Sequence, residues 1–172
     1  HPGAVLPDRR PLCNAAVNND FNTLDGDETG DRNAFWEDRN YRKDVSHVQA
    51  AVFAVHGFQD DNVKMDQLWP WWNGLKAAGV PRKLWLLRSG HTDPFDARRD
   101  VWVDTLHRWF DHWLYGVDNG IMSEPAVTIE DDKDVWGEYA DWPIPGTSDV
   151  DVFLQATTAD AAGVLRGTSG GP

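Results

Sequence analysis

Two short apolar runs, each ending in glycine and polar residues, constrain the fold of this chain more than any other feature. The first run, AVFAVHG at residues 51–57, leads into Asp60 and Asp61, and the second, RKLWLLRSGH, ends at His91. Such runs are typical of strands that are buried on both faces and open into loops at their carboxyl ends. A helical pattern near residues 64–78 lies between them, so the sequence predicts a strand–helix–strand unit of the α/β class.

A second helix follows the second run. Apolar side chains recur at three- and four-residue intervals from about Phe95 to Tyr115, and Gly116 follows as a typical helix end. From about Ser123 the sequence changes to short strand-like stretches, AVTIEDDKDVW and SDVDVFLQATT, separated by Pro-Gly turns. Strand, helix, strand, helix and then strands alone predict an α/β unit followed by the start of a separate β domain.

The segment before the first strand carries weaker signals. Residues 1–33 are rich in Pro, Gly, Asn and Asp, which predicts loop with one short helix. Its acidic run DGDETGD lacks the alternating spacing and distal glutamate of an EF-hand loop, so we interpret it as a solvated loop. Residues 34–49, where aromatic side chains stand among charges, predict a short helix before the first strand.

Charge and composition exclude several function classes. The chain has 28 acidic and 16 basic residues and no basic stripe, which argues against nucleic acid as a partner. The acidic balance is compatible with a peptide substrate bearing a free amino terminus, and it is also common on soluble proteins. No apolar stretch approaches the ~18 residues of a membrane span, so we expect no membrane partner. The single cysteine, Cys13, excludes an internal disulfide framework and a Cys-rich metal site, and we expect no cofactor.

The two predicted strand ends carry complementary chemistry. Neighbouring strands of such a sheet end at the same edge, so Asp60 or Asp61 and His91 are expected to lie close together. An aspartate followed by a histidine matches the last two members of the Ser, Asp, His order of α/β-hydrolases. An aspartate after a strand can also cap the next helix, and the local sequence by itself favours that role because helix N-caps are far commoner than triads.

The third member of such a triad is missing from the expected place. The serines are Ser46, Ser89, Ser123, Ser148 and Ser169. Only GTSGG, residues 167–171, has the Gly-x-Ser-x-Gly spacing of a nucleophile elbow, yet it follows no apolar strand and comes after the histidine. We interpret it as a flexible tail. The histidines offer no competing metal site, because His107 and His112 are five residues apart and no HExxH motif occurs.

Several of these motifs together resemble the Xaa-Pro dipeptidyl-peptidase family, serine hydrolases related to cocaine-esterase-type acyl hydrolases. The matching stretches are VHGFQDDNVK, then LRSGHTDP, then the Trp-rich helix that ends WFDHWLYGVDNGI. Upstream, FWEDRNYRKDVSHVQAAVFAVHG is similar to the passage from that family's helical cap into the strand before its catalytic aspartate. Downstream, AVTIEDDKDVWGEYADWPIP resembles the start of its jelly-roll domain.

The resemblance implies an α/β-hydrolase fold, present as its carboxy-terminal half with part of a helical cap, followed by the beginning of a β jelly-roll domain. The implied segments are a cap or loop segment over 1–42, the half α/β domain over 43–122 and the jelly-roll start over 123–172. It makes Asp60 the triad acid and His91 the general base, and leaves Asp61 as a loop or cap residue. The serine and the oxyanion hole would then lie on a missing or second polypeptide.

The implied reaction removes an amino-terminal Xaa-Pro dipeptide through an acyl-enzyme. Such a substrate needs an apolar slot for the proline ring and a carboxylate for its free ammonium group. The candidates for the slot are Trp36, Tyr41, Trp69 and Trp72, and those for the ammonium are Glu37 and Asp38.

Two alternatives remain open. The same fold, with the same roles for Asp60 and His91, can act as an esterase or acylase on small esters or amides. A non-catalytic carbohydrate- or ligand-binding module is the second alternative, and it predicts that Asp60 and His91 are not hydrogen-bonded neighbours. The amino terminus lacks the apolar core of a signal peptide. We nevertheless expect an extracellular location, with the cytoplasm as the alternative.

Overall fold

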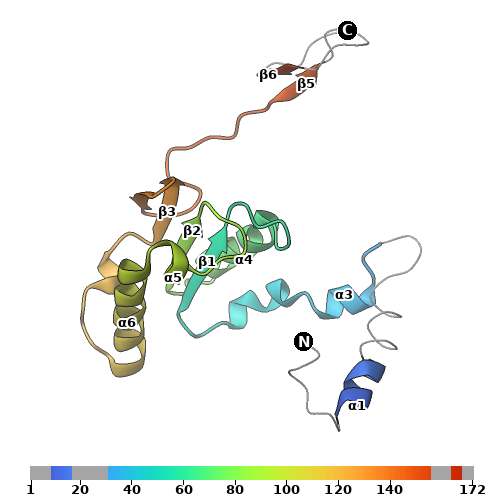
Figure 1. The fold of residues 1–172 in the computed structure, drawn as a ribbon, viewed down its shortest axis with the longest axis horizontal. Coiled ribbons are helices and arrows are strands. Elements are labelled where there is room, and N and C mark those ends of the chain that lie inside the picture. The colour runs from blue at the N-terminus through green and yellow to red at the C-terminus, as the bar shows by residue number, and fades with distance from the viewer. Residues whose placement is uncertain (1–8, 17–30, 156–163, 168–172) are drawn as a thin grey trace. The chain divides into compact units, whose positions relative to one another are not determined.

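The computed structural model of the chain describes residues 9–16, 31–155 and 164–167. Figure 1 shows the order of its helices and strands along the chain. They fall into two compact units, formed by residues 1–52 with 62–82 and by residues 53–61 with 83–172.

The described part of the first unit is mainly helical. Its elements are α1 (Arg10–Ala15), α3 (Ala34–Asp38), the 3₁₀ helix η2 (Tyr41–His47) and α4 (Met65–Ala77). Asn33 begins α3, because its side-chain oxygen accepts a hydrogen bond from the Phe35 backbone N–H at 3.0 Å. The short helix predicted over residues 34–49 is therefore formed as two consecutive pieces, α3 and η2.

Helix α4 confirms the helix predicted near residues 64–78. Its Trp72 and Leu75 side chains are fully buried, and the Arg82 guanidinium carbon lies 4.5 Å from the centroid of a Trp72 ring. Helix α4 also packs on η2 at Gly74, where a Cβ atom would come within 2.8 Å of the Val45 side chain. The close packing of α4 on η2 therefore depends on residue 74 being a glycine, which has no side chain.

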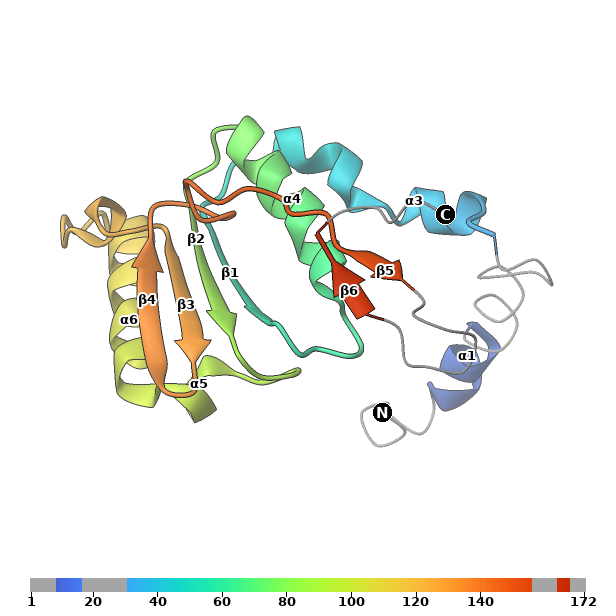
Figure 2. The same cartoon turned by 90° about the horizontal axis from the view of Figure 1, so that it is seen from above.

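A four-stranded sheet forms the centre of the second unit (Figure 2). Its strands, in spatial order, are β1 (Val52–Gly57), β2 (Arg82–Leu87), β3 (Val127–Asp132) and β4 (Val135–Tyr139). The Val52 N–H donates to the Pro81 carbonyl, and the Phe58 N–H donates to the Leu87 carbonyl. Residue numbers increase in the same direction on both strands from the first bond to the second, so β1 and β2 are parallel. Strand β3 is parallel to β2, and β4 is antiparallel to β3.

The structure differs from the sequence prediction of a separate β domain from about Ser123. Strand β3 joins the sheet of the α/β unit, with Leu84 opposite Val127 and Leu86 opposite Ile129. The physical reason is burial, because Val127 and Ile129 are almost completely buried and complete the existing core instead of starting a new one. The fold is α/β with a mixed sheet.

Two further strands follow the sheet along the chain. Strands β5 (Phe153–Gln155) and β6 (Val164–Arg166) form an antiparallel pair, with Leu154 opposite Leu165. Two short strands do not establish a jelly roll, so the jelly-roll domain stays a prediction.

The long helix predicted from Phe95 to Tyr115 is formed as two helices. They are the short α5 (Pro94–Ala97) and the long α6 (Arg99–Tyr115). The break lies at Arg98, whose backbone leaves the helical region with φ −146° and ψ 56°. The end of α6 is as predicted, because Gly116 has φ 68°, a left-handed conformation that glycine adopts without steric cost.

An aromatic cluster joins α6 to the sheet. Trp102 on α6 lies with its ring centroid 5.2 Å from those of both Phe53 on β1 and Trp85 on β2. Trp136 on β4 packs against the same cluster, with its ring centroid 5.5 Å from that of Trp85. Aromatic pairs at these distances add specific attraction to the burial of large apolar areas. The apolar face predicted for this helix therefore packs into the core at Trp102 and Trp109 of α6.

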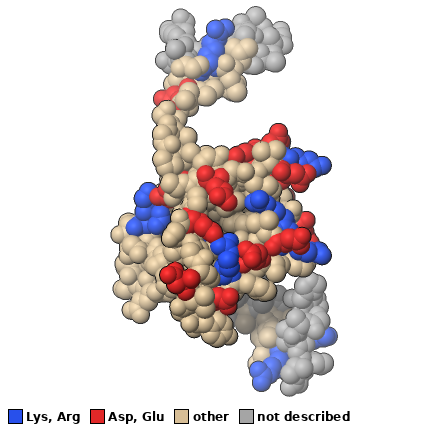
Figure 3. Space-filling view, turned by 90° about the vertical axis from the view of Figure 1, so that its left-hand side faces the viewer, with Lys and Arg blue, Asp and Glu red and all other residues tan. Residues whose placement is uncertain are grey.

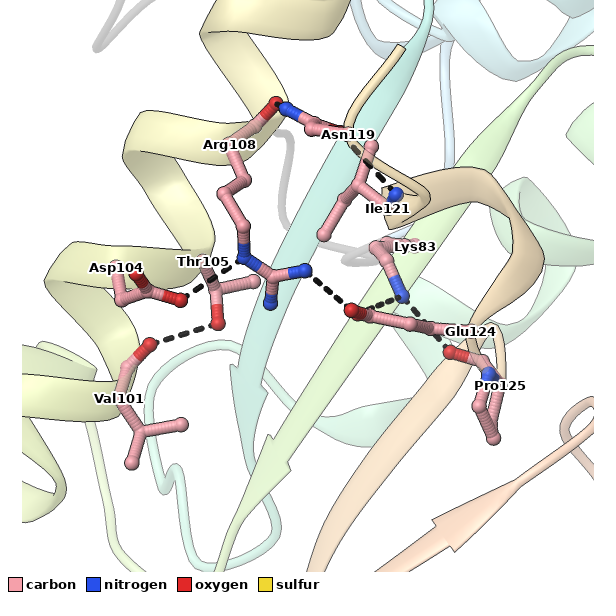
Figure 4. Close-up of polar contacts among 9 residues, drawn as sticks. All are labelled: Lys83, Val101, Asp104, Thr105, Arg108, Asn119, Ile121, Glu124 and Pro125. Carbon is pink, nitrogen blue, oxygen red and sulfur yellow. Dashed lines mark hydrogen bonds and ion pairs between the residues drawn. The ribbon is translucent and has the colours of Figure 1, made fainter.

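A polar network fixes the connection between α6 and β3 (Figure 4). The buried Lys83 amine on β2 donates to the Pro125 carbonyl at 2.9 Å and lies 3.6 Å from the Glu124 carboxylate. Glu124 also accepts from Arg108 on α6, which pairs in addition with Asp104 at 2.9 Å. The connecting segment, which includes the 3₁₀ helix η3 (Ile121–Ser123), is thereby tied to both the helix and the sheet.

Burial of Lys83 is expected to make the free energy of unfolding depend on pH. Burial lowers the pKa of its amine from 10.5, and Glu124 opposes this shift. Between that lowered pKa and 10.5 the unfolded chain binds more protons than the folded chain, so the stability contributed by Lys83 rises with pH in this window. Urea unfolding of the native sequence and of Lys83→Met should show a free-energy difference that moves in favour of the native sequence as pH rises. A difference independent of pH would contradict the prediction.

The surface carries charges of both signs. Figure 3 shows acidic and basic side chains interspersed on one face of the molecule. Exposed pairs include Arg32 with Glu37 at 3.0 Å and Arg88 with Asp132. Exposed pairs of this kind add little stability each. Within residues 9–16, 31–155 and 164–167, no helix has the length and apolar character needed to cross a membrane.

Candidate active site

Two backbone hydrogen bonds extend the pairing of β1 and β2 beyond the ends of the strands. The Phe58 N–H donates to the Leu87 carbonyl at 2.8 Å, and the Gln59 N–H donates to the Ser89 carbonyl at 2.9 Å. Within the first loop, the Asp60 N–H donates to the Gly57 carbonyl at 3.2 Å, which closes a tight turn. These bonds set the loops that carry Asp60 and His91 side by side.

The structure brings Asp60 and His91 together. His91 Nδ1 lies 2.7 Å from Asp60 Oδ2, within the range of a charge-assisted hydrogen bond. The Asp60 side chain is only 3% exposed, whereas the His91 side chain is 75% exposed. A hydrogen bond between these residues is what both enzyme hypotheses require and what the binding-module hypothesis does not.

This arrangement determines what the imidazole can do. An ionised carboxylate only accepts hydrogen bonds, so Nδ1 is the donor when Asp60 is ionised, and Nε2 then has its lone pair exposed. The His91 side chain as a whole is 75% exposed. A histidine oriented in this way can take a proton from a hydroxyl group that approaches Nε2 and return it to a leaving group.

The alternative role of the two aspartates as helix caps does not agree with the structure. Helix α4 begins at Met65, and its N-cap is Lys64, which makes no side-chain capping hydrogen bond. Asp60 is instead the partner of His91, and Asp61 is an exposed loop residue. The sequence could not separate the two roles, because the loop of residues 58–64 is long enough to permit either.

The hydrogen bond that the structure describes for His91 is to Asp60 and not to a serine. The Ser89 hydroxyl, two residues before His91, is buried and makes no hydrogen bond to any described residue. Ser169 of the GTSGG stretch lies outside the described residues. The His56 Nε2 atom at the end of β1 is likewise buried and has no hydrogen-bond partner among the described residues. Nor, in this described part, do three or more His, Cys, Asp or Glu side chains gather where they could hold a metal ion.

The candidate substrate-binding residues belong to the first unit, whereas Asp60 and His91 belong to the second. Trp36 and Tyr41 line a hollow of about 710 Å³, together with Trp71 and the three arginines Arg32, Arg39 and Arg42. Trp69 is half-buried and is not part of this lining.

Trp72 does not fit a slot for substrate. Its side chain has 0% exposure, and Arg82 covers its ring. Sequence spacing alone could not show that Trp72 is buried, because Trp69, three residues earlier on the same helix, is only half-buried. Of the acidic candidates, Glu37 pairs with Arg32 at 3.0 Å and Asp38 lies 3.8 Å from Arg39, so both carboxylates have cationic neighbours.

Sequence reasoning missed two features of these regions. One is the number of arginines around the hollow, which the spacing of Arg32, Arg39 and Arg42 does not suggest. The other is the close approach of Gly57 to the backbone at residues 89 and 90. Its signal in the sequence was a glycine directly after an apolar strand, which often marks a point where two backbones come close.

Comparison with known proteins gives consistent matches. The family model of the X-Pro dipeptidyl-peptidase (S15 family) matches residues 8–93, a range that includes both Asp60 and His91. A putative Xaa-Pro dipeptidyl-peptidase of Streptomyces avermitilis is 48% identical over 158 residues, which are 92% of this chain and 23% of that protein. Another from Bacillus anthracis is 41% identical over 142 residues, 83% of this chain and 23% of that protein.

Solved structures show the likeness in fold. The crystal structure of a CocE/NonD family hydrolase from Staphylococcus aureus matches with a TM-score of 0.57 and 15% sequence identity, over 73% of this chain and 22% of that one. At this identity the match concerns the fold alone. The chain spans 23% of the length of each of the two relatives named above.

Proposed function

The chain belongs to the X-Pro dipeptidyl-peptidase (S15) family, and on that premise we propose that it supplies the acid and the base of a serine peptidase. The peptidase would remove amino-terminal Xaa-Pro dipeptides through an acyl-enzyme. In this proposal His91 takes the proton of a serine hydroxyl and gives it to the leaving amine, while Asp60 orients the imidazole and stabilises its charged form.

The observation that carries the proposal is the hydrogen bond between His91 and Asp60 at 2.7 Å, with a buried acid and an exposed base. A buried carboxylate holds the ring in one orientation, and an exposed ring leaves Nε2 accessible to a nucleophile. A pair that served only stability would gain little from an imidazole that is 75% exposed.

The serine nucleophile and the oxyanion-hole donors are proposed to lie outside residues 1–172, on a missing or separate chain. The chain order supports this proposal, because the serine precedes the aspartate and the histidine in α/β-hydrolases. The greater length of the relatives supports it as well, since this chain matches only 23% of the Streptomyces avermitilis protein. We also propose that the strands beyond β4 lead into a jelly-roll domain.

For the substrate, we propose that the hollow lined by Trp36 and Tyr41 receives an apolar ring such as that of proline. Aromatic faces suit such a ring because they offer large, rigid apolar area. Glu37 remains the candidate for the free ammonium group, although binding would compete with its ion pair to Arg32. Trp72 is no longer a candidate, because it is fully buried.

Paired substrates test the proposed activity. The complete native protein, which contains this chain together with the polypeptide proposed to carry the serine, is assayed with a chromogenic Xaa-Pro anilide and with a short-chain ester of similar leaving group. We expect the anilide to be hydrolysed and an anilide lacking proline at the second position to be refused. Negligible anilide turnover with good ester turnover would favour the esterase alternative, and no turnover of either would favour the binding module.

An inhibitor locates the nucleophile. Labelling the native protein with a fluorophosphonate, followed by mass spectrometry, should place the label on a serine outside residues 1–172. A label on Ser89 or on any other serine of this chain would contradict the proposed division of the triad.

A further inference from the structure

From the packing of the two loops we infer that Gly57 is a positioning residue for the Asp60–His91 pair. It acts through its lack of a side chain, which lets the loop after β1 lie directly on the loop after β2. This inference rests on the proposed function for its effect on catalysis, but the geometry that it describes can be measured without any assay of activity.

Gly57 is connected to both members of the pair. On one side its carbonyl accepts the hydrogen bond from the Asp60 N–H at 3.2 Å, so it starts the turn that presents Asp60. On the other side, a Cβ atom at position 57 would overlap the carbonyl oxygens of Ser89 and Gly90, the two residues that precede His91. Both distances fall well inside the 3.0 Å that real Cβ atoms respect.

The obstacle at position 57 is backbone, which cannot rotate out of the way as a side chain can. An alanine methyl group there would force the two loops apart by on the order of 1 Å, because close-packed interiors transmit strain instead of absorbing it. A separation of that size takes His91 Nδ1 and Asp60 Oδ2 from 2.7 Å to beyond hydrogen-bond distance. The imidazole would then lose the partner that fixes its tautomer.

The chain provides two matched controls. At Gly90, next to His91, a Cβ atom would lie 3.5 Å from the Gln59 carbonyl, which is ordinary contact. Gly90→Ala therefore adds the same methyl group to the same pair of loops without a clash. At Gly74, in the first unit, a Cβ atom would lie 2.8 Å from the Val45 side chain. Gly74→Ala therefore adds a clash within the other unit and controls for lost stability.

The experiment measures the His91 tautomer by nitrogen-15 NMR in the native protein and in the three alanine variants, and compares kcat and KM on the Xaa-Pro anilide. In Gly57→Ala we expect a mixture of tautomers in place of the single Nδ1–H form. We also expect kcat to fall by about 100-fold with KM little changed. Gly90→Ala and Gly74→Ala should keep the native tautomer, and Gly74→Ala should lose thermal stability.

An unchanged tautomer in Gly57→Ala would overturn the inference whatever the activity. If the variant does not fold, hydrogen exchange of the native protein decides instead. The Phe58 and Gln59 amides should then be protected as strand amides are, and exchange as fast as that of free loop amides would overturn the inference. Failure of the proposed function would look different: the native protein would not hydrolyse the anilide, or His91→Ala would still hydrolyse it, while the tautomer result at Gly57 stood unaffected.

Discussion

Replacing His91 with alanine is expected to lower kcat on an Xaa-Pro anilide by on the order of 10⁶-fold, as loss of the base does in other serine hydrolases. The serine hydroxyl is a weak nucleophile near neutral pH and needs a base to take its proton. The His91 ring is exposed and is held by Asp60, and no other described histidine has such a carboxylate partner. The measurement is steady-state kinetics, with KM expected to change little because the imidazole acts mainly in the transition state.

His107 supplies the control for this experiment. It is exposed on α6 and belongs to the same unit as His91, so His107→Ala removes an imidazole without touching the loops after β1 and β2. We expect this variant to keep its activity. Full activity of His91→Ala would refute the proposed role of the Asp60–His91 pair in catalysis.

The substitution Asp60→Asn is expected to lower kcat by about 10⁴-fold while the fold is preserved. Asparagine has nearly the same size as aspartate, but its amide can donate a hydrogen bond to Nδ1. That bond favours the tautomer with the proton on Nε2, which can no longer accept a proton from serine. Circular dichroism and thermal unfolding should show a folded protein, and nitrogen-15 NMR should show the changed tautomer of His91.

Asp61→Asn is the matched control, because it makes the same chemical change one residue away. Asp61 is exposed and is not the hydrogen-bond partner of His91, so we expect activity close to that of the native protein. Equal losses in the two variants would mean that the acidic loop as a whole acts on the reaction, and the specific role of Asp60 would be rejected.

The central elements of the fold were predictable because their signals are local. Strands β1 and β2 contain the continuous apolar runs VFAV and LWLL, and α4 has helical periodicity with a glycine and a proline after it. The place of β3 was not predictable in the same way. Its alternation of apolar and polar residues shows a strand, but only the buried positions of Val127 and Ile129 show which core that strand completes.

The same distinction applies to the candidate site. The proximity of Asp60 and His91 follows from the rule that neighbouring parallel strands end at one edge. The choice of Asp60 over Asp61, and over a helix cap, rested on family resemblance, because both residues stand in one loop. The prediction of Trp72 as part of the proline slot is wrong, because sequence spacing does not reveal the direction of a side chain. A glycine directly after an apolar strand marks Gly57 as a point of close approach, but only the structure shows that the carbonyls of residues 89 and 90 are what it approaches.

The place of β1 at the end of the strand order has a consequence for handling the chain in solution. An edge strand presents a row of backbone N–H and C=O groups that another strand can pair with, and proteins usually guard such edges with charge or proline. Strand β1, with the sequence VFAVHG, carries neither lysine nor proline nor an acidic residue. Among the strands that the structure describes, none pairs with the outer edge of β1. We therefore expect the chain by itself to self-associate along this edge.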